Sequence, residues 1–467
     1  MGNSSILKHT TIYAIGDIIP KIVNFIFFPI LTRYLSPADY GIINYVNSFN
    51  AFVLILSVLC LNTYYMVYFN KVQTEDERKK LLGSLSLFVV ILNVVVTLVL
   101  LVCGNLWFDK ISENIPFYPY MVIGLFINLF NSIAVMPLAT LRMEENVKTY
   151  TILSVSKAIL ITVCTFLSVV FIAPNATSAL LSQMIVIMVY AVLFIVFTSK
   201  NAIITLNKYY IKEGLKFSLP LVPGSLAYYA VTMSDRIFIN KYLSLFDLGI
   251  YSTASTLALI LVTISTGAYR AFEPYVFKLP DNSSKEDAIK KLFKNYFLAV
   301  LFFALGISLF AKEFLVFFAD EKYHIAYKYV PLILIGTIFT SLSLLFSTVI
   351  ISNGQTIINS LVSIIGGAIS VSLNILFLRY GVIFACITSM VSLGVMFILN
   401  VYYSRIKLNW FPYICIFFIS YSMQICFYIT DLNIWWELLI KTCYIALVAY
   451  IFYSRMDIKI KRTKELH

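Results

Sequence analysis

The stretch RYLSPADYGI at residues 33–42 returns as KYLSLFDLGI at residues 241–250. Six of the ten positions are identical and another exchanges Arg for Lys, at an offset of 208 in a chain of 467 residues. Long apolar segments on both sides of the two stretches come into register at the same offset. The chain therefore contains a duplicated unit of nearly half its length, and internal repeats of this kind are typical of membrane transporters.

The composition places the chain in a membrane. It is 60% hydrophobic and 12% charged, whereas soluble domains carry roughly 25% charged residues. A membrane-spanning helix needs about 20 mostly apolar residues, and the unbroken runs indicate helices rather than the strands of an outer-membrane barrel. The predicted fold is an all-α integral membrane protein with fourteen spans, at 11–32, 40–68, 81–107, 117–140, 149–173, 176–198, 215–239, 246–277, 293–316, 329–352, 355–378, 381–403, 409–430 and 433–453.

The repeat predicts three parts. They are an N-terminal half of six spans (1–205, the N-half), a C-terminal half of six spans (206–406, the C-half) and an extension of two spans with a basic tail (407–467). Because six is even, both halves enter the membrane from the same face, and repeats of this type hold substrate between lobes that move in alternating access. The connector at 199–214 is expected to be a basic linker.

Lys and Arg concentrate in the loops on the side of this map that carries both termini. The positive-inside rule makes that side cytoplasmic. The same bias accounts for most of the net charge of +12, so membrane lipids are expected partners and nucleic acid is not. The seven cysteines all lie in predicted spans and the three histidines are scattered, so no disulfide, metal or other cofactor is predicted.

Charged side chains inside the spans are the main site candidates, since a cation near the bilayer centre costs roughly 2.5–3.5 kcal/mol on insertion scales. The candidate cavity cations are Lys21, Arg270, Arg236 and Lys157, with Asp17, Asn24, Asn62, Asp235 and Glu273 as supporting polar residues. Asp17 with Lys21, and Arg270 with Glu273, could instead neutralise each other along one helix face. Lys441 lies one turn from Glu437, and a structural ion pair is the better interpretation there.

Spans 1 and 7 occupy equivalent places in the halves and both contain prolines, Pro20 and Pro29 in one and Pro220 and Pro223 in the other. Interrupted helices at matching positions indicate a binding site, although a purely structural kink is the alternative. We also expect the glycine shared by the two repeats to permit a tight turn, and the shared Ser or Asp to cap the helix that follows.

Several stretches together resemble a known family. They are TRYLSPADYGI after span 1, LRMEENVKTYTILSVSKAI between spans 4 and 5, FSLPLVPGSLAYYAVTMSDRIFINKYLSLFDLGIYSTAS across spans 7 and 8, and AFEPYVFK ending span 8. They look like the polysaccharide biosynthesis flippases, bacterial O-antigen and capsule repeat-unit exporters of the multidrug/oligosaccharidyl-lipid/polysaccharide superfamily. The resemblance covers about residues 1–405.

The resemblance implies a 14-helix inner-membrane protein that moves an undecaprenyl-diphosphate-linked oligosaccharide outward. The family's cationic cavity would correspond here to Lys21 and Arg270, and its Asp-Arg pair to Asp235 and Arg236. A polysaccharide polymerase and glycosyltransferases are the implied protein partners.

Two alternatives stay open, and a third class lacks the features that it needs. A cation-coupled multidrug exporter of the same superfamily, using H⁺ or Na⁺, would favour acidic and aromatic cavity residues. A lipid II flippase would place several arginines in the cavity, whereas span 1 offers Lys21 and span 2 only Asn62. A membrane-embedded glycosyltransferase or polymerase would need a large external loop or a catalytic carboxylate motif, and the sequence shows neither.

Overall fold

The structure is a computed structural model that describes residues 3–72, 74–278, 283–429 and 434–455; within these ranges the side chains of residues 3–18 and of several others lie outside the description. Its secondary structure over these ranges is entirely helical. The N-half contains α1 (Asn3–Tyr34), α2 (Pro37–Val58), α3 (Leu61–Phe69), α4 (Glu75–Ile111), η1 (Phe117–Met121), α5 (Val122–Ile133), α6 (Val135–Met143), α7 (Val147–Phe171) and α8 (Ala176–Asn201).

The C-half contains α9 (Lys208–Ser218), η2 (Leu219–Leu221), α10 (Val222–Tyr242), α11 (Leu245–Lys278), α12 (Ser283–Leu309), α13 (Ala311–Phe318), η3 (Glu321–Lys328), α14 (Val330–Ser352), α15 (Thr356–Phe377), η4 (Leu378–Tyr380) and α16 (Val382–Ser404). The extension contains α17 (Phe411–Ile429) and α18 (Ile434–Arg455). Each of the fourteen predicted spans overlaps one or more of these helices, and within the described ranges 10 helices are long and apolar enough to cross a membrane. The prediction of an all-α, multi-pass membrane protein of roughly fourteen helices is confirmed.

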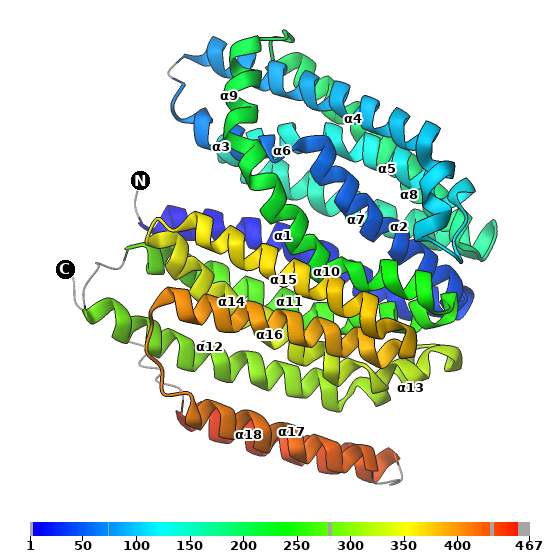
Figure 1. Cartoon of the computed structure of the whole chain (residues 1–467), viewed down its shortest axis with the longest axis vertical. Helices are drawn as coiled ribbons and strands as arrows, with labels where there is room; N and C mark the ends of the chain where they lie inside the picture. The colour runs from blue at the N-terminus through cyan, green and yellow to red at the C-terminus, as the bar shows by residue number, and fades with distance from the viewer. Residues whose placement is uncertain (1–2, 73, 279–282, 430–433, 456–467) are drawn as a thin grey trace.

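The helices lie side by side with their axes roughly aligned (Figure 1). The figure shows α3 to α8 at one edge of the molecule and α17 and α18 at the other, beyond α12. Four helices make the main contacts between the halves: α2 packs against α10 and α11, and α1 packs against α11. The interface between the halves is therefore built from spans 1, 2, 7 and 8.

The two repeated stretches fold alike. Ser36 Oγ accepts a hydrogen bond from Asp39 N at 3.1 Å, and Ser244 Oγ accepts one from Asp247 N at 3.1 Å. Each serine hydroxyl also donates to the carboxylate of that aspartate. Both serines therefore cap the helix that follows, α2 or α11, and the cap prediction is confirmed.

The shared glycines do not turn the chain, so that prediction is wrong. Gly41 lies inside α2 and Gly249 inside α11, and neither has a positive φ. A Cβ on Gly249 would lie 1.8 Å from the carbonyl oxygen of Pro37, and one on Gly41 would lie 3.0 Å from that of Leu245. Pro37 and Leu245 are equivalent at the offset of 208, so the two glycines give α2 and α11 a reciprocal close contact.

The prolines have different effects in spans 1 and 7. α1 runs as one helix through Pro20 and Pro29, so the predicted interruption of span 1 is wrong. Proline removes one backbone hydrogen bond, and neighbouring helices can satisfy the carbonyl that it frees. Span 7 is interrupted as predicted, because the 3₁₀ turn η2, which includes Pro220, separates α9 from α10.

Span 2 contains a break that the sequence did not predict. Leu59 and Cys60, between α2 and α3, both have left-handed backbone conformations, with φ of 50° and 57°. The residues at the equivalent positions in the C-half, Gly267 and Ala268, lie inside the single helix α11. One of two equivalent helices is therefore broken and the other is continuous.

The segment between the halves, residues 202–207, runs along α4. Ile203 N donates to the carbonyl oxygen of Lys79 at 3.1 Å, and Asn207 N donates to Ser84 Oγ at 3.3 Å. A Cβ on Gly83 would lie only 2.0 Å from the Ile203 oxygen, so glycine is needed there. α9 then packs against α3 and α4. The predicted linker is thus largely ordered on the surface of the N-half.

Candidate functional site

A cavity of about 490 Å³ lies between α1 and α11, which belong to different halves. Its polar lining consists of Lys21 and Asn24 from α1 and Thr256 and Thr263 from α11. The remaining lining residues are Ile22, Phe25, Leu259, Ile260, Ile264, Gly267 and Ala268. None of these described lining residues is acidic. The cavity therefore offers one cation, one amide and two hydroxyls on a mainly apolar wall.

Asn24 is in contact with α7 as well as with the cavity. The buried Oγ1 of Thr162 lies 2.9 Å from Asn24 Oδ1 and 2.9 Å from the carbonyl oxygen of Ala158. A hydroxyl has one hydrogen, so Thr162 donates to one of these acceptors at a time. The packing of α1 on α7 thus fixes the Asn24 amide in the cavity wall. Asp17, the predicted partner of Lys21, has its side chain outside the described residues.

The threonines of α11 present hydroxyl oxygens to the cavity. Thr256 donates to the carbonyl of Ser252 at 2.9 Å, and its oxygen is 2.9 Å from Tyr40 OH on α2. Thr263 donates to the carbonyl of Leu259 at 2.7 Å. Both hydroxyl hydrogens are therefore directed into the helix itself, so the oxygens are acceptors for what lies beside them. We did not predict these threonines; their spacing of seven residues, one face of a helix, is the signal that could have found them.

Arg270 and Glu273 lie on α11 just beyond the cavity. Arg270 is two residues after the lining residue Ala268, is partly buried and is not itself among the lining residues. Glu273 accepts a hydrogen bond from Tyr269 at 2.8 Å, and Tyr269 OH is 2.6 Å from Thr348 Oγ1 on α14. Of the two residues predicted to share a cavity, Lys21 and Arg270, the described cavity thus includes only Lys21.

Asp235 is buried inside the C-half. Its carboxylate accepts hydrogen bonds from Tyr251 OH at 2.5 Å, from Asn374 Nδ2 at 2.9 Å and from Ser389 Oγ. These donors stand on α11, α15 and α16, so the carboxylate on α10 ties four helices together. This arrangement satisfies a charge that would otherwise be costly to bury.

Arg236, the next residue, is also buried, with 8% of its surface exposed. Its guanidinium carbon lies 5.8 Å from the centre of the Tyr251 ring, and Nη1 is 3.5 Å from Met233 Sδ. Ser48 Oγ of α2 lies 3.6 Å from the same sulfur, and its nearer acceptor is the Asn44 carbonyl oxygen at 2.7 Å. Arg236 therefore lies where α10 meets α2, and it is not among the residues that line the α1–α11 cavity.

The two remaining candidates lie in the N-half. Lys157 on α7 donates to Asn131 Oδ1 on α5 at 2.6 Å. Asn62 is on α3, beyond the break in span 2, and is half-buried. Neither is among the residues that line the cavity.

Reciprocal contacts close the interface at the end where α1 meets α2 and α10 meets α11. Tyr323 OH, in η3 of the C-half, donates to the carbonyl oxygen of Leu35 at 3.1 Å. Asn114 Nδ2, of the N-half, donates to the carbonyl oxygen of Leu243 at 2.8 Å and to that of Asn240 at 2.6 Å. Leu35 and Leu243 are equivalent at the offset of 208. Each half therefore binds the same carbonyl of the other half, and we call these contacts the clasp.

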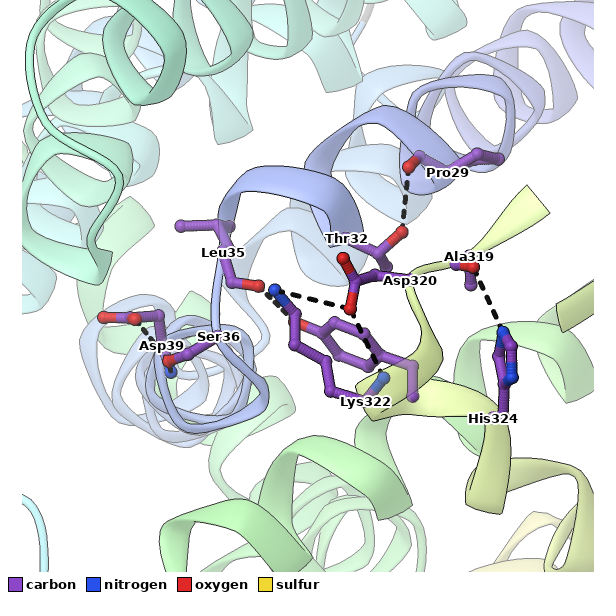
Figure 2. A network of polar contacts seen from close by, with 10 residues as sticks. Pro29, Thr32, Leu35, Ser36, Asp39, Ala319, Asp320, Lys322 and His324 are labelled. Atoms are coloured by element: carbon purple, nitrogen blue, oxygen red, sulfur yellow. Dashed lines mark hydrogen bonds and ion pairs between the residues drawn. The ribbon is translucent and has the colours of Figure 1, made fainter. Parts of the chain in front are cut away.

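Figure 2 shows the first side of the clasp from close by, with Leu35 and Ser36 beside Asp320 and Lys322. Asp320 Oδ1 accepts a hydrogen bond from Lys322 N at 3.3 Å and lies 3.8 Å from Lys322 Nζ. Asp320 thereby caps η3 and sets the position of Tyr323, whose ring is fully buried.

At the opposite end, α3 meets the start of the C-half. Cys60 Sγ lies 3.4 Å from Ser225 Oγ of α10. The rings of Tyr64 and Phe217 are 5.9 Å apart, and Gly214 lies against Leu61 and Tyr64. The halves are thus in contact at both ends of their interface, with the cavity between.

Buried charges hold the extension to the C-half. Lys441 pairs with Glu437 at 2.7 Å, as predicted, and also with Glu313 of α13 at 2.7 Å. Glu437 pairs in turn with Lys312 at 2.9 Å. These four residues, which we call the charge quartet, join α18 to α13.

Comparisons with known proteins agree with this geometry. The profile of the polysaccharide biosynthesis protein family matches residues 6–280. An uncharacterized membrane protein of Haemophilus influenzae is 24% identical over 366 residues, which cover 75% of this chain and 85% of that protein.

Two solved structures show the same fold. The lipid II flippase MurJ, in an inward closed conformation, is similar with a TM-score of 0.74 and 16% identity over 95% of this chain and 98% of its own. An inward-facing MATE multidrug resistance transporter of the MOP superfamily gives a TM-score of 0.59 and 15% identity over 86% and 94% of the two chains. At these identities the likeness is one of fold, whereas the family profile matches well over half of the sequence. The chain belongs to the polysaccharide biosynthesis protein family.

Proposed function

We propose that this protein is a flippase of the bacterial inner membrane that moves an undecaprenyl-diphosphate-linked oligosaccharide from the cytoplasmic to the periplasmic leaflet by alternating access. Its product would feed O-antigen or capsule synthesis, and both termini would be cytoplasmic. The observation that carries the proposal is the cavity between α1 and α11, where Lys21 of one half faces the threonines of the other. Membership of a polysaccharide biosynthesis family and a MurJ-like fold support the same substrate class.

The cavity chemistry suits such a substrate. A diphosphate in a low-dielectric cleft needs a compensating cation, and a lysine ammonium binds phosphate oxygens as a compact point charge. Thr256 and Thr263 offer hydroxyl oxygens that can accept hydrogen bonds from sugar hydroxyls. The polyprenyl chain would stay in lipid. Together these features support a binding mode with the head group, rather than the lipid tail, in the cavity.

The other candidate cations have graded roles in this proposal. Arg270, beside the cavity on α11, would be the second cation for the diphosphate as the halves move, with Glu273 and Asp17 balancing charge. Arg236 and Lys157 lie outside the described cavity and are the weaker candidates. Asn62 and Asp235 would act through helix packing.

A multidrug exporter is the second candidate, because the chain also shares the MATE fold. A cationic drug would be repelled by Lys21 and would need an acidic partner, and the described lining provides none. The one charged residue of the described lining is a lysine, and this supports an anionic substrate over a cationic drug.

The test is a deletion strain of the native host complemented with single variants. We expect deletion to abolish the surface polysaccharide and Lys21→Ala to lower it about 10-fold or more, since hydrogen bonds to charged groups contribute about 1.5–3 kcal/mol. Lys21→Arg should keep partial activity, and Arg270→Lys should retain more than Arg270→Ala. Lys290→Ala, which removes an exposed ion pair with Glu286, is the matched control and should leave the polysaccharide unchanged.

Immunoblots of membranes must show normal abundance of each variant. Proteoliposomes then separate the two candidate functions: polyprenyl-diphosphate oligosaccharide should be translocated and a fluorescent cationic drug should not. Wild-type surface polysaccharide in a Lys21→Ala/Arg270→Ala strain would eliminate the site, and drug export by the purified protein would favour the second candidate.

A further inference from the structure

The break in span 2 is held by tertiary contacts rather than by its local sequence. Left-handed backbone is unfavourable for residues with a Cβ, yet Leu59 and Cys60 adopt it in succession. Glycine, the residue that suits this conformation, stands instead at the equivalent position 267, inside the continuous helix α11. The residues at the break thus disfavour a bend, whereas the glycine in α11 would permit one. We infer that span 2 can adopt both a bent form, as here, and a straight form like α11.

The contacts that stabilise the bent form come from α3. Leu61, Tyr64 and Tyr65 are buried, and Tyr65 OH is 2.9 Å from Thr140 Oγ1 of α6. α3 also packs against α9. If α2 and α3 formed one straight helix like α11, the axis of α3 would change and these contacts could not all be kept.

The break lies where the N-half touches the beginning of the C-half. Cys60 itself is 3.4 Å from Ser225 of α10, and Leu61, the first residue of α3, lies against Gly214 of α9. These contacts are at the end of the interface opposite the clasp. Residues 267 and 268, equivalent to the two bent residues, line the cavity. The break therefore corresponds in the repeat to the end of the cavity wall on α11, and it lies next to the contact that joins α3 to α9 and α10.

We propose that Leu59–Cys60 is the hinge of a gate at the end of the cavity opposite the clasp, with α3 as its moving part. In the bent form α3 holds α9 and the start of α10, and the gate is closed. When α2 and α3 straighten, Cys60 leaves Ser225 and this end of the cavity opens. The assignment of this end to the cytoplasm and of the substrate rests on the proposed function, whereas the hinge motion does not.

The first experiment uses the native thiol of Cys60. Ser225→Cys is introduced into a protein whose other six cysteines are replaced by alanine, and membranes are oxidised with copper phenanthroline. The bent form should give a rapid intramolecular cross-link that dithiothreitol reverses. The same protein with Cys60→Ala is the control and should give none. Cross-linked protein should have lost substrate translocation, and reduction should restore it.

The second experiment shifts the hinge without touching the cross-linked pair. Leu59→Gly removes the penalty of the left-handed conformation, and Leu59→Val raises it, because a β-branched side chain fits that conformation poorly. We expect Leu59→Gly to raise the cross-linking rate about fivefold or more over Leu59→Val, from the preference against left-handed backbone. A substitution one turn earlier, Ile55→Val inside α2, should leave the rate unchanged.

The outcomes separate the gate from the proposed function. Equal cross-linking rates in Leu59→Gly and Leu59→Val, or full translocation by cross-linked protein, would overturn the hinge. If the rates differ as expected but lipid-linked oligosaccharide is not translocated, the hinge stands and the proposed substrate is wrong.

Discussion

The two halves of the molecule are alike at one end of their interface and different at the other. At the clasp, the same carbonyl in each half accepts a hydrogen bond from the other half, and both helices that follow begin with the same Ser-Asp cap. At the opposite end, α2 breaks at Leu59 while α11 continues through Gly267. The symmetric end is built from the repeated sequence, whereas at the other end equivalent helices differ in conformation.

A second difference lies in how the halves fix the equivalent residues Ser57 and Ser265. In the N-half, Ser57 donates to Asn93 at 3.0 Å, and Asn128 Nδ2 is 3.2 Å from the same oxygen of Asn93. In the C-half, Ser265 bonds Ser341 at 2.9 Å. The set in the N-half joins spans 2, 3 and 4 and contains two amides, whereas the pair in the C-half joins the equivalent of two of these, spans 8 and 10, through hydroxyls alone. Position in the repeat is preserved while the chemistry has changed.

The largest effect on stability is expected from the charge quartet. Among the described residues, these ion pairs join the extension to the C-half and have no counterpart in the N-half. Glu437 is 1% exposed and pairs with both lysines. Glu437→Ala should lower the free energy of unfolding by about 3 kcal/mol, the low end for a broken buried ion pair, because buried Lys441 keeps Glu313 and Lys312 is about a third exposed. The change in stability is measured by heating wild type and variant in detergent and following the loss of monodisperse protein.

Lys290→Ala provides the matched control. Lys290 Nζ lies 3.0 Å from Glu286, and both side chains are more than a third exposed, so removal of this ion pair should change stability by no more than about 1 kcal/mol. Equal melting temperatures for the two variants would mean that the extension is not anchored by these charges.

An intermediate effect is expected at the glycines of the α2–α11 contact, and it tests how symmetric that contact is. Gly249→Ala places a Cβ 1.8 Å from the Pro37 oxygen, whereas a Cβ on Gly41 would lie 2.8 Å from its nearest atom, the Gly249 nitrogen, and 3.0 Å from the Leu245 oxygen. Overpacking typically costs about 1–3 kcal/mol, so we expect Gly249→Ala near the top of this range and Gly41→Ala near the bottom. Thermal melts of both proteins in the same detergent rank the two losses of stability. A larger loss for Gly41→Ala than for Gly249→Ala would show that the contact is tighter at Gly41.

The smallest effect is expected at the clasp. Tyr323→Phe and Asn114→Ala each remove hydrogen bonds to backbone carbonyls, at about 0.5–1.5 kcal/mol per bond. Because the two contacts close one interface, the double variant should show a coupling of about 0.5 kcal/mol or more. Strictly additive effects on the melting free energy would indicate that the two sides of the clasp open independently.

Much of this fold could be predicted from the sequence because membrane helices are long and apolar. The Ser-Asp caps were also predictable, since they depend on residues only three apart. The role of Gly41 and Gly249 was not, because it depends on contact between segments about 200 residues apart in sequence. The break at Leu59 was missed for a related reason: neither Leu nor Cys favours that backbone, and the contacts of α3 impose it.

The site was less predictable than the fold. Lys21 and Asn24 could be chosen because polar residues are rare and costly in a span, and both line the cavity. The same argument chose Asp235, which is held by three neutral donors within the C-half. Burial cost alone does not distinguish a side chain that meets substrate from one that joins helices. Thr256 was missed because a threonine in a helix is not costly.

The ordered segment at 202–207 determines how the two halves can move relative to each other. Gly83 lets Ile203 lie directly on α4, and α9 packs beside it. The linker between the halves is therefore in contact with the N-half along most of its length. The only chain between α9 and α10 is the short turn Leu219–Leu221. In the proposed alternating access, a rotation of one half against the other would therefore change the backbone of these three residues, while the linker stays in contact with the N-half.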